Sequence, residues 1–421
     1  MRMATRVTTR LKKLVKILGP GLITGASDDD PSGIATYSQA GAKFGYSTLW
    51  TALITFPLMA AVQGMCARIG IVTSQGLTVT LKKHYPKSIL YLMMLFSIPA
   101  IVLNIGADIQ GMGAVAHMIV PAIRTSVFCV IITGILMYVI IKFPYQKISA
   151  VLKWLCITLL LYILVPFFVK EDWHAIFYHT FIPTIKFNKE FFSILVAILG
   201  TTISPYLFFW QATMEAEDMA HKGRRIIVNK HILDNMKMDV NFGMFLSNVV
   251  MFFIILTTAT VLFKSGVTQI DTVDQAAQAL KPVAGNLTYI IFALGVLGTG
   301  LLAIPVLAGS QSYMLAETFG WEEGLDKKFG EAKGFYITVI ISLLVGLSLD
   351  FIGISPIHAL LYTAILYGIT SPVMIAIILH IGNNKKVMGE FTNSKLSNIL
   401  GFITLLLMTV AAIALIYFQF S

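Results

Sequence analysis

The chain has 421 residues, of which 57% are hydrophobic and only 12% are charged, and its mean hydropathy is +0.80. Soluble domains carry about 25% charged residues, so most of this chain must face lipid or other apolar helices. The net charge of +10 does not indicate a nucleic-acid partner, because it follows from the placement of basic residues in loops. We therefore expect an all-α polytopic membrane protein.

Apolar runs of about 20 residues, the length that crosses a bilayer as a helix, predict eleven spans. They lie near residues 14–42, 46–70, 88–119, 125–142, 148–169, 191–218, 241–263, 286–317, 334–352, 357–380 and 397–420. The first is not expected to be a cleaved signal peptide, because no small-residue cleavage site follows it.

The first span is interrupted by Asp28-Asp29-Asp30-Pro31-Ser32-Gly33. A carboxylate at bilayer depth costs about 2.5–3.5 kcal/mol, so three together are rarely incidental. Proline removes a backbone donor and glycine frees the dihedral angles, which predicts a break in the helix. A broken membrane helix lined with carboxylates is typical of the cation site of a transporter.

The sixth span has a similar break, where Pro205 follows Ser204. Five spans run from each break, and an eleventh is appended, which predicts two five-helix repeats of inverted topology. A chance pair of proline kinks is the alternative. Unwound segments expose carbonyl oxygens, and carbonyl, carboxylate and hydroxyl oxygens suit Mg²⁺, Ca²⁺ and Mn²⁺.

Basic residues predict the orientation in the cell membrane. They concentrate in the N-terminal tail and alternate loops, at 2–13, 82–87, 147, 222–237, 327–328 and 385–395. This asymmetry places the N-terminus in the cytoplasm, and an odd number of spans then places Ser421 outside. The predicted parts are a cytoplasmic basic tail (1–13), a first five-helix repeat (14–169), an extracellular loop (170–190), a second repeat (191–380), and a loop with the eleventh helix (381–421).

Several stretches resemble the Nramp family of divalent-metal transporters, and the resemblance extends over nearly the whole chain. They are Gly19-Pro20-Gly21, Asp30-Pro31, Ala35-Thr36, Phe44-Gly45-Tyr46, Leu49-Trp50 and the segments 274–282 and 304–310. The resemblance implies a LeuT-like fold, in which helices 1 and 6 are broken. The eleven predicted helices match the family's bacterial members.

The departures from the family pattern concern the metal ligands. The family's first-helix motif is Asp-Pro-Gly-Asn, and here Asp30 keeps the first role while Gly33 replaces the asparagine. The sixth-helix motif is Ala-x-x-Met-Pro-His, and here Thr201 begins it and Ser204 replaces the methionine. Losing a soft thioether removes the preference for transition metals. A roomier site of oxygen ligands suits Mg²⁺, which gives up water reluctantly.

Two positions of the family's proton path also differ. The sixth-helix histidine is Tyr206, and the glutamate three positions after Asp108 is Gly111. Histidine titrates near neutral pH, whereas tyrosine and glycine do not. These changes resemble the Nramp-related magnesium transporter branch, and they imply weak or absent proton coupling.

The predicted metal ligands are Asp30, Gly33, Thr201, Ser204, Asp29, Asp108 and Thr370. Three adjacent carboxylates cannot all point at one ion, so Asp28 and Asp29 could instead contact a ligand of the ion rather than the ion, carry a vestibule charge, or form salt bridges. Asp108 could form hydrogen bonds within the bundle, and Ser204 could return its hydroxyl to its own helix. Thr370 lies where the family often has a glutamine that helps to hold the ion.

We therefore expect a secondary transporter that takes up Mg²⁺, and also Mn²⁺, by alternating access. The alternatives are a proton-coupled Mn²⁺/Fe²⁺ transporter and an organic-solute transporter of the same fold, although three aspartates would repel a carboxylate solute. An ion channel would ordinarily need a symmetric pore or a re-entrant filter. No nucleophile motif indicates an enzyme, and no cofactor is expected. The partners are the cation and the lipid bilayer, and the oligomeric state is not predicted.

Overall fold

The computed structural model describes residues 19–144, 147, 155–169, 171–221 and 228–420. Every regular element in that part of the chain is a helix, as the all-α prediction requires. The predicted basic tail, 1–13, lies outside the described residues, and so does most of the basic cluster that begins at Lys222.

Nine stretches of the described residues are long and apolar enough to cross a membrane. They contain α4 (Trp50–Thr73), α6 (Lys87–Ile119), α7 (Thr125–Lys142), α11 (Lys189–Thr202) with α12 (Pro205–His221), α13 (Lys230–Thr258) with the π-helical turn η3 (Ala259–Phe263), α16 (Thr288–Phe319), α17 (Lys333–Ser348) with η6 (Leu349–Ile352), α18 (Pro356–Asn383) and α20 (Lys395–Phe420). The first predicted span consists of two helices that are each too short to cross alone, α2 (Pro20–Asp28) and α3 (Pro31–Phe44). The described part of the fifth is η2 (Leu155–Ile163) and α9 (Val165–Phe168).

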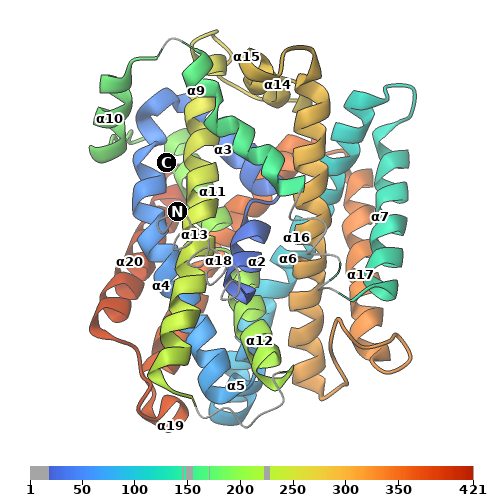
Figure 1. Cartoon of the computed structure of the whole chain (residues 1–421), viewed down its shortest axis with the longest axis vertical. Helices are drawn as coiled ribbons and strands as arrows, with labels where there is room; N and C mark the ends of the chain where they lie inside the picture. The colour runs from blue at the N-terminus through green and yellow to red at the C-terminus, as the bar shows by residue number, and fades with distance from the viewer. Residues whose placement is uncertain (1–18, 145–146, 148–154, 170, 222–227, 421) are drawn as a thin grey trace, which may run out of the picture.

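Short helices lie at the two ends of the bundle (Figure 1). The upper end in that view carries α10 (Trp173–Phe181), α14 (Val273–Ala277), η4 (Gln278–Leu280), α15 (Lys281–Ala284) and η5 (Gly285–Leu287), and η1 (Gly45–Thr48) joins α3 to α4. The lower end carries α5 (Leu77–His84) and α19 (Lys385–Met388). The broken helices lie in the middle, where α2 and α3 pack on α13, and α11 packs on α18.

The seventh predicted span begins earlier than expected, at Lys230 rather than at 241. Asn229 caps this extension, because its side chain accepts the backbone N–H of Ile232 at 3.0 Å. The first turns of α13 are too polar to register as a membrane span, so hydropathy alone sets the boundary too late.

The extension of α13 contains Asp239, which fixes the start of α2. Its carboxylate accepts the backbone N–H groups of Gly19, Gly21 and Leu22 at 2.8, 2.7 and 3.3 Å. The first N–H groups of a helix have no partner within the helix, and an anion there also interacts favourably with the helix dipole. Asp239 therefore anchors the end of α2 that lies away from the break.

Glycines bring α2 and α13 into backbone contact. A Cβ on Gly25 would lie 2.3 Å from the carbonyl oxygen of Gly243, and a Cβ on Gly243 would lie 2.2 Å from that of Gly21. Small residues four apart on one helix allow this close approach in membranes. The contact positions the last turn of α2, which leads directly into the acidic break.

We predict that Gly25→Ala lowers the melting temperature of the purified protein in detergent. The added methyl group cannot fit without separating α2 from α13, and overpacking of this kind costs about 1–3 kcal/mol. Gly64→Ala on α4 is the matched control, because a Cβ there meets no atom within 4 Å. Equal melting temperatures for the two variants would contradict the close contact.

Candidate functional site

The two helix breaks meet in the middle of the bundle. The first lies between Asp28 and Pro31, and the second between Thr202 and Pro205. A Cβ on Gly33 would lie 3.4 Å from the carbonyl oxygen of Asp28 and equally far from the hydroxyl oxygen of Thr201. The two breaks, which come from spans distant in sequence, therefore lie beside each other. Each break occurs directly before the proline that predicts it.

Asp30 caps α3 and faces α6. Its Oδ1 accepts the backbone N–H of Gly33 at 2.7 Å, and its Oδ2 accepts the side-chain amide of Asn104 at 3.0 Å. The residue is 2% exposed, and no ion pair among the described residues includes it. Both donors are neutral, so they orient the carboxylate without balancing its charge. An ionised carboxylate has about four acceptor positions, which leaves some for a cation.

Asn104 was not predicted, and it connects three helices. Its side-chain oxygen accepts the hydroxyl of Thr363 on α18 at 3.0 Å, while its amide donates to Asp30. The hydroxyl of Ser32 donates to the carbonyl oxygen of Leu360 on α18 at 3.0 Å. The segment between α2 and α3 is therefore held by α6 and α18. The sequence did contain a signal for Asn104. It lies four residues before Asp108, a spacing that places both side chains on one face of a helix.

Asp108 is fully buried, and no side chain among the described residues donates a hydrogen bond to its carboxylate oxygens. It lies within electrostatic reach of Asp30. The backbone N–H of Ser32 also acts on this carboxylate, so the alternative that Asp108 forms hydrogen bonds within the bundle stays a prediction. A buried carboxylate without partners is costly unless a cation or a proton neutralises it.

The position of Gly111 is apolar. A Cβ there would lie 3.1 Å from Cδ1 of Leu360 and 3.7 Å from Cβ of Pro31. These residues line a small cavity with Ile34, Val115 and other apolar side chains, and no titratable residue contributes to its lining within the described structure. No side chain at Gly111 can therefore carry a proton onward from Asp108.

Side-chain hydroxyl groups contact backbone carbonyl groups at the second helix break. The Ser204 hydroxyl donates to the carbonyl oxygen of Thr201 at 2.6 Å, so its hydrogen points back to its own helix. The Ser371 hydroxyl on α18 lies 2.9 Å from the carbonyl oxygen of Ile203, within the break. The hydroxyl of the neighbouring Thr370 lies 3.0 Å from the carbonyl oxygen of Leu366 on its own helix. Thr370 stays a predicted ligand, whereas the Ser371 hydroxyl lies near both the break and the carbonyl oxygen of Tyr367 on its own helix, at 2.7 Å.

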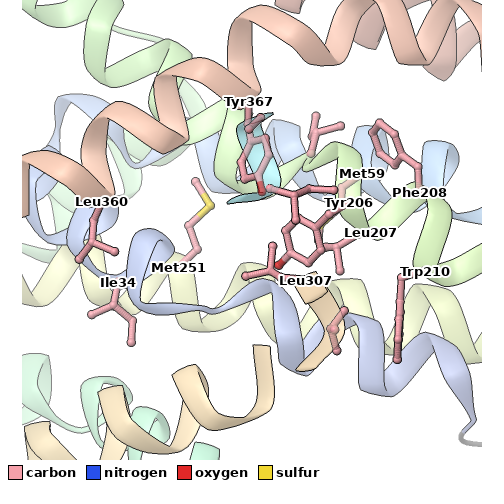
Figure 2. Packing of buried hydrophobic residues seen from close by; sticks show 14 of the residues in the cluster. Ile34, Met59, Tyr206, Leu207, Phe208, Trp210, Met251, Leu307, Leu360 and Tyr367 are labelled. Atoms are coloured by element: carbon pink, nitrogen blue, oxygen red, sulfur yellow. The ribbon is translucent and has the colours of Figure 1, made fainter. Parts of the chain in front are cut away.

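Tyr206 ties the second broken helix to the first. Its hydroxyl donates to the carbonyl oxygen of Ser27, in the last turn of α2, at 3.0 Å. Its ring lies beside that of Tyr367, with 5.8 Å between the centroids (Figure 2). Tyr206 therefore satisfies a carbonyl group left free by the end of α2, and its hydroxyl hydrogen is engaged in that bond.

Asp28 and Asp29 face α13 rather than α6. The hydroxyl of Ser247 lies 2.8 Å from Oδ2 of Asp28 and 3.2 Å from Oδ1 of Asp29. Both aspartates are buried, and neither takes part in an ion pair within the described residues. The structure thus gives no support to a vestibule charge or a salt-bridge partner. The predicted role of Asp29 as a ligand of the same ion as Asp30 stays a prediction.

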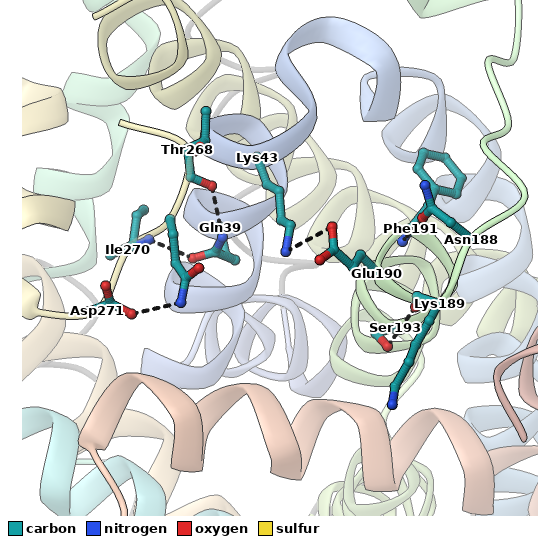
Figure 3. Close-up of polar contacts among 11 residues, drawn as sticks. Gln39, Lys43, Asn188, Lys189, Glu190, Phe191, Ser193, Thr268, Ile270 and Asp271 are labelled. Atoms are coloured by element: carbon teal, nitrogen blue, oxygen red, sulfur yellow. Dashed lines mark hydrogen bonds and ion pairs between the residues drawn. The ribbon is translucent and has the colours of Figure 1, made fainter. Parts of the chain in front are cut away.

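The upper end of the site is closed by polar contacts (Figure 3). Gln39 on α3 accepts the backbone N–H of Ile270 at 2.9 Å, and its amide lies 3.5 Å from the carbonyl oxygen of Thr268. Lys43 pairs with Glu190, at the start of α11, at 3.2 Å. These contacts attach the upper part of α3 to the segment after η3 and to α11.

The lower end contains a cavity of about 780 Å³, counting the part open to solvent. Pro20 at the start of α2, Trp210 and Glu217 on α12, Tyr313 on α16 and Asp326 contribute to its lining. The described molecule therefore has polar contacts across its upper end and a cavity at its lower end. No three His, Cys, Asp or Glu side chains among the described residues converge on a metal position. A cation here would depend on few carboxylates, with hydroxyl, carbonyl and water oxygens completing its ligands.

The chain matches known proteins over nearly its whole length. The model of the Nramp family, described as natural resistance-associated macrophage protein-like, matches residues 21–418. A relative from Clostridium acetobutylicum, named divalent metal cation transporter MntH, is 26% identical over 99% of this chain and 94% of its own length. A relative of the same name from Caldanaerobacter subterraneus is 24% identical over 93% and 90%.

Solved structures share the fold. A manganese transporter from Eremococcus coleocola matches with a TM-score of 0.77 at 16% identity, over 96% of this chain and 86% of that one. Mhp1, a nucleobase-cation-symport-1 family transporter in a closed conformation, matches with a TM-score of 0.55 at 14% identity, over 95% and 92%. These likenesses confirm the predicted LeuT-like fold. Because the family model covers nearly the whole sequence and the fold agrees with it, the chain belongs to the Nramp family.

Proposed function

We propose that this protein is a secondary transporter that carries a divalent metal cation across the cell membrane by alternating access. The observation that carries the proposal is the pair of buried carboxylates, Asp30 and Asp108, at the meeting point of two broken helices without a cationic partner among the described residues. A divalent cation would balance both charges. The names of the relatives support the same class of cargo.

The proposed ligands are the Asp30 carboxylate, oxygens of Thr201 and Ser204, and Asp108. Gly33 offers no side chain, and its position beside the Asp28 carbonyl and the Thr201 hydroxyl leaves room for water on the ion. Thr370 and Asp29 complete the predicted set, although the Thr370 hydroxyl lies near its own helix and Asp29 lies near Ser247. A partly hydrated ion with oxygen ligands is the arrangement that Mg²⁺ favours.

We also propose an orientation. The lower end carries Lys82 and Lys83 on α5 and Lys385 on α19, so the positive-inside rule assigns it to the cytoplasm. The repeats then comprise 14–169 and 191–380, with residues 1–13 inside, 170–190 outside and Ser421 outside. In this orientation the cavity of the lower end faces the cytoplasm and the Gln39 and Lys43 contacts face the outside, as one state of an alternating-access cycle would have them.

We predict that Asp30→Ala lowers Mg²⁺ and Mn²⁺ uptake into proteoliposomes by at least about a hundredfold. Removing one partner of a buried charge pair costs about 3–5 kcal/mol, and Asp30 is the central anionic ligand in this proposal. Asp234→Ala, which removes an exposed carboxylate on α13, is the control and should leave uptake unchanged. Normal uptake by a folded Asp30→Ala protein would rule out the assigned site.

We predict that Mg²⁺ competes well with Mn²⁺ in the wild type, and that Ser204→Met shifts the preference toward Mn²⁺ and Cd²⁺. A thioether adds a soft ligand to a site of oxygens. The sulfur of Met251 lies 3.8 Å from the hydroxyl of Thr202, so Met251→Leu tests whether a native thioether contributes (Figure 2). Wild-type protein that transports Mn²⁺ and ignores millimolar Mg²⁺ would refute the Mg²⁺ assignment.

We predict that uptake is driven by the membrane potential with weak or no proton coupling. A potential of about 100 mV, negative inside, supplies about 4.6 kcal/mol to a double charge. Two features support weak proton coupling. The position of Gly111 has apolar surroundings, and the hydroxyl hydrogen of Tyr206 is donated to the carbonyl oxygen of Ser27. In liposomes that contain a pH dye, an inside-negative potential should accelerate uptake without acidifying the lumen.

The competing function is proton-coupled Mn²⁺ or Fe²⁺ transport, and the unpartnered carboxylate of Asp108 is the observation that favours it. Acidification of the lumen in proportion to metal uptake, abolished by Asp108→Asn, would support that alternative against ours. Uptake of an organic carboxylate is disfavoured by the buried aspartates, which would repel it.

A further inference from the structure

We propose that Asp28, Asp29 and Ser247 form a second cation subsite on the α13 side of the break, beside the Asp30 site. The ligand would be a divalent cation such as Mn²⁺ or Mg²⁺. The inference rests on the proposed function for the class of cation. It adds an ion-binding position made of Asp28 and Ser247, to which the transport proposal gives no role, together with Asp29.

The geometry of Ser247 brings the two carboxylates together. Its oxygen lies 2.8 Å from Oδ2 of Asp28 and 3.2 Å from Oδ1 of Asp29. A hydroxyl has one hydrogen, so it cannot donate a full hydrogen bond to both carboxylates at once. The hydroxyl oxygen also has lone pairs, and it can therefore act as a ligand together with the two carboxylates.

The carboxyl groups at this position have no cationic partner among the described residues. Asp28 is 0% exposed and Asp29 is 5% exposed, and Oδ1 of Asp28 is buried without a hydrogen-bond partner. None of the ion pairs in the described structure includes either residue. Two carboxylates carry a charge of −2, which one divalent cation balances, and Mg²⁺ and Mn²⁺ accept carboxylate, hydroxyl and water oxygens as ligands.

This position differs from the Asp30 site. The carboxylate of Asp30 points toward Asn104 on α6, whereas that of Asp28 points toward Ser247 on α13. These hydrogen bonds hold the two carboxylates toward different helices. The backbone links the two positions, because the carbonyl oxygen of Asp28 faces Gly33. The subsite also lies at the inner end of α2, whose other end contributes to the lower cavity.

Binding of Mn²⁺ to the purified full-length protein, measured by equilibrium dialysis, tests the subsite. We expect two Mn²⁺ per wild-type chain, one in Asp30→Ala, and one in the double variant Asp28→Asn/Asp29→Asn. Ser247→Ala changes no charge, and it should weaken one site by about tenfold while the other keeps its affinity. The two bound ions should also broaden each other's electron paramagnetic resonance spectrum, and each single-site variant should lose this broadening.

A single Mn²⁺ site that Asp30→Ala abolishes would overturn the subsite and leave the proposed function intact. The absence of any Mn²⁺ binding to folded wild-type protein would overturn both. Two sites without mutual broadening, or two sites that survive in Asp28→Asn/Asp29→Asn, would place the second ion elsewhere and would also overturn the subsite.

Discussion

Buried negative charge at the centre of the bundle is the constraint on which the other features of the structure depend. Asp28, Asp29, Asp30 and Asp108 are all at most 5% exposed. The side chains that contact them most closely, Asn104 and Ser247, are neutral. Neutral donors orient a carboxylate but leave its charge, and an apolar interior makes that charge costly. In the proposed function, a cation that enters the site would balance this charge.

The surrounding contacts hold the broken backbone in place. Asp239 accepts N–H groups at the start of α2, Tyr206 donates to the carbonyl oxygen of Ser27, and Ser371 lies within hydrogen-bonding distance of the Ile203 carbonyl. Each contact satisfies a backbone group that a broken helix leaves without a partner. In the proposed alternating-access cycle some of these contacts would change. The Gln39 and Lys43 contacts at the upper end would then open to admit a cation from that side.

The sequence predicted the breaks well because their signals are local. Three carboxylates with a proline inside an apolar run, and Pro205 in a second run, are visible without tertiary contacts. Asn104 and Ser247 were missed because each is a single neutral polar residue in an apolar helix. The role of such a residue depends on which helix packs against it, and the sequence does not show that. Thr370 and Ser371 are adjacent, and a turn of about 100° per residue decides which of them reaches the break. The polar start of α13 was missed because hydropathy reports only the part within the bilayer.

Anomalous diffraction from crystals soaked in Mn²⁺ tests the central claim most directly, because the signal locates the metal without reference to its assumed ligands. We predict a peak bound to the carboxylate of Asp30, where the break before α3 meets Thr201 on α11. A peak held only by Glu217 and other acids of the lower cavity, with none at Asp30, would contradict the assignment of the helix breaks as the cation site.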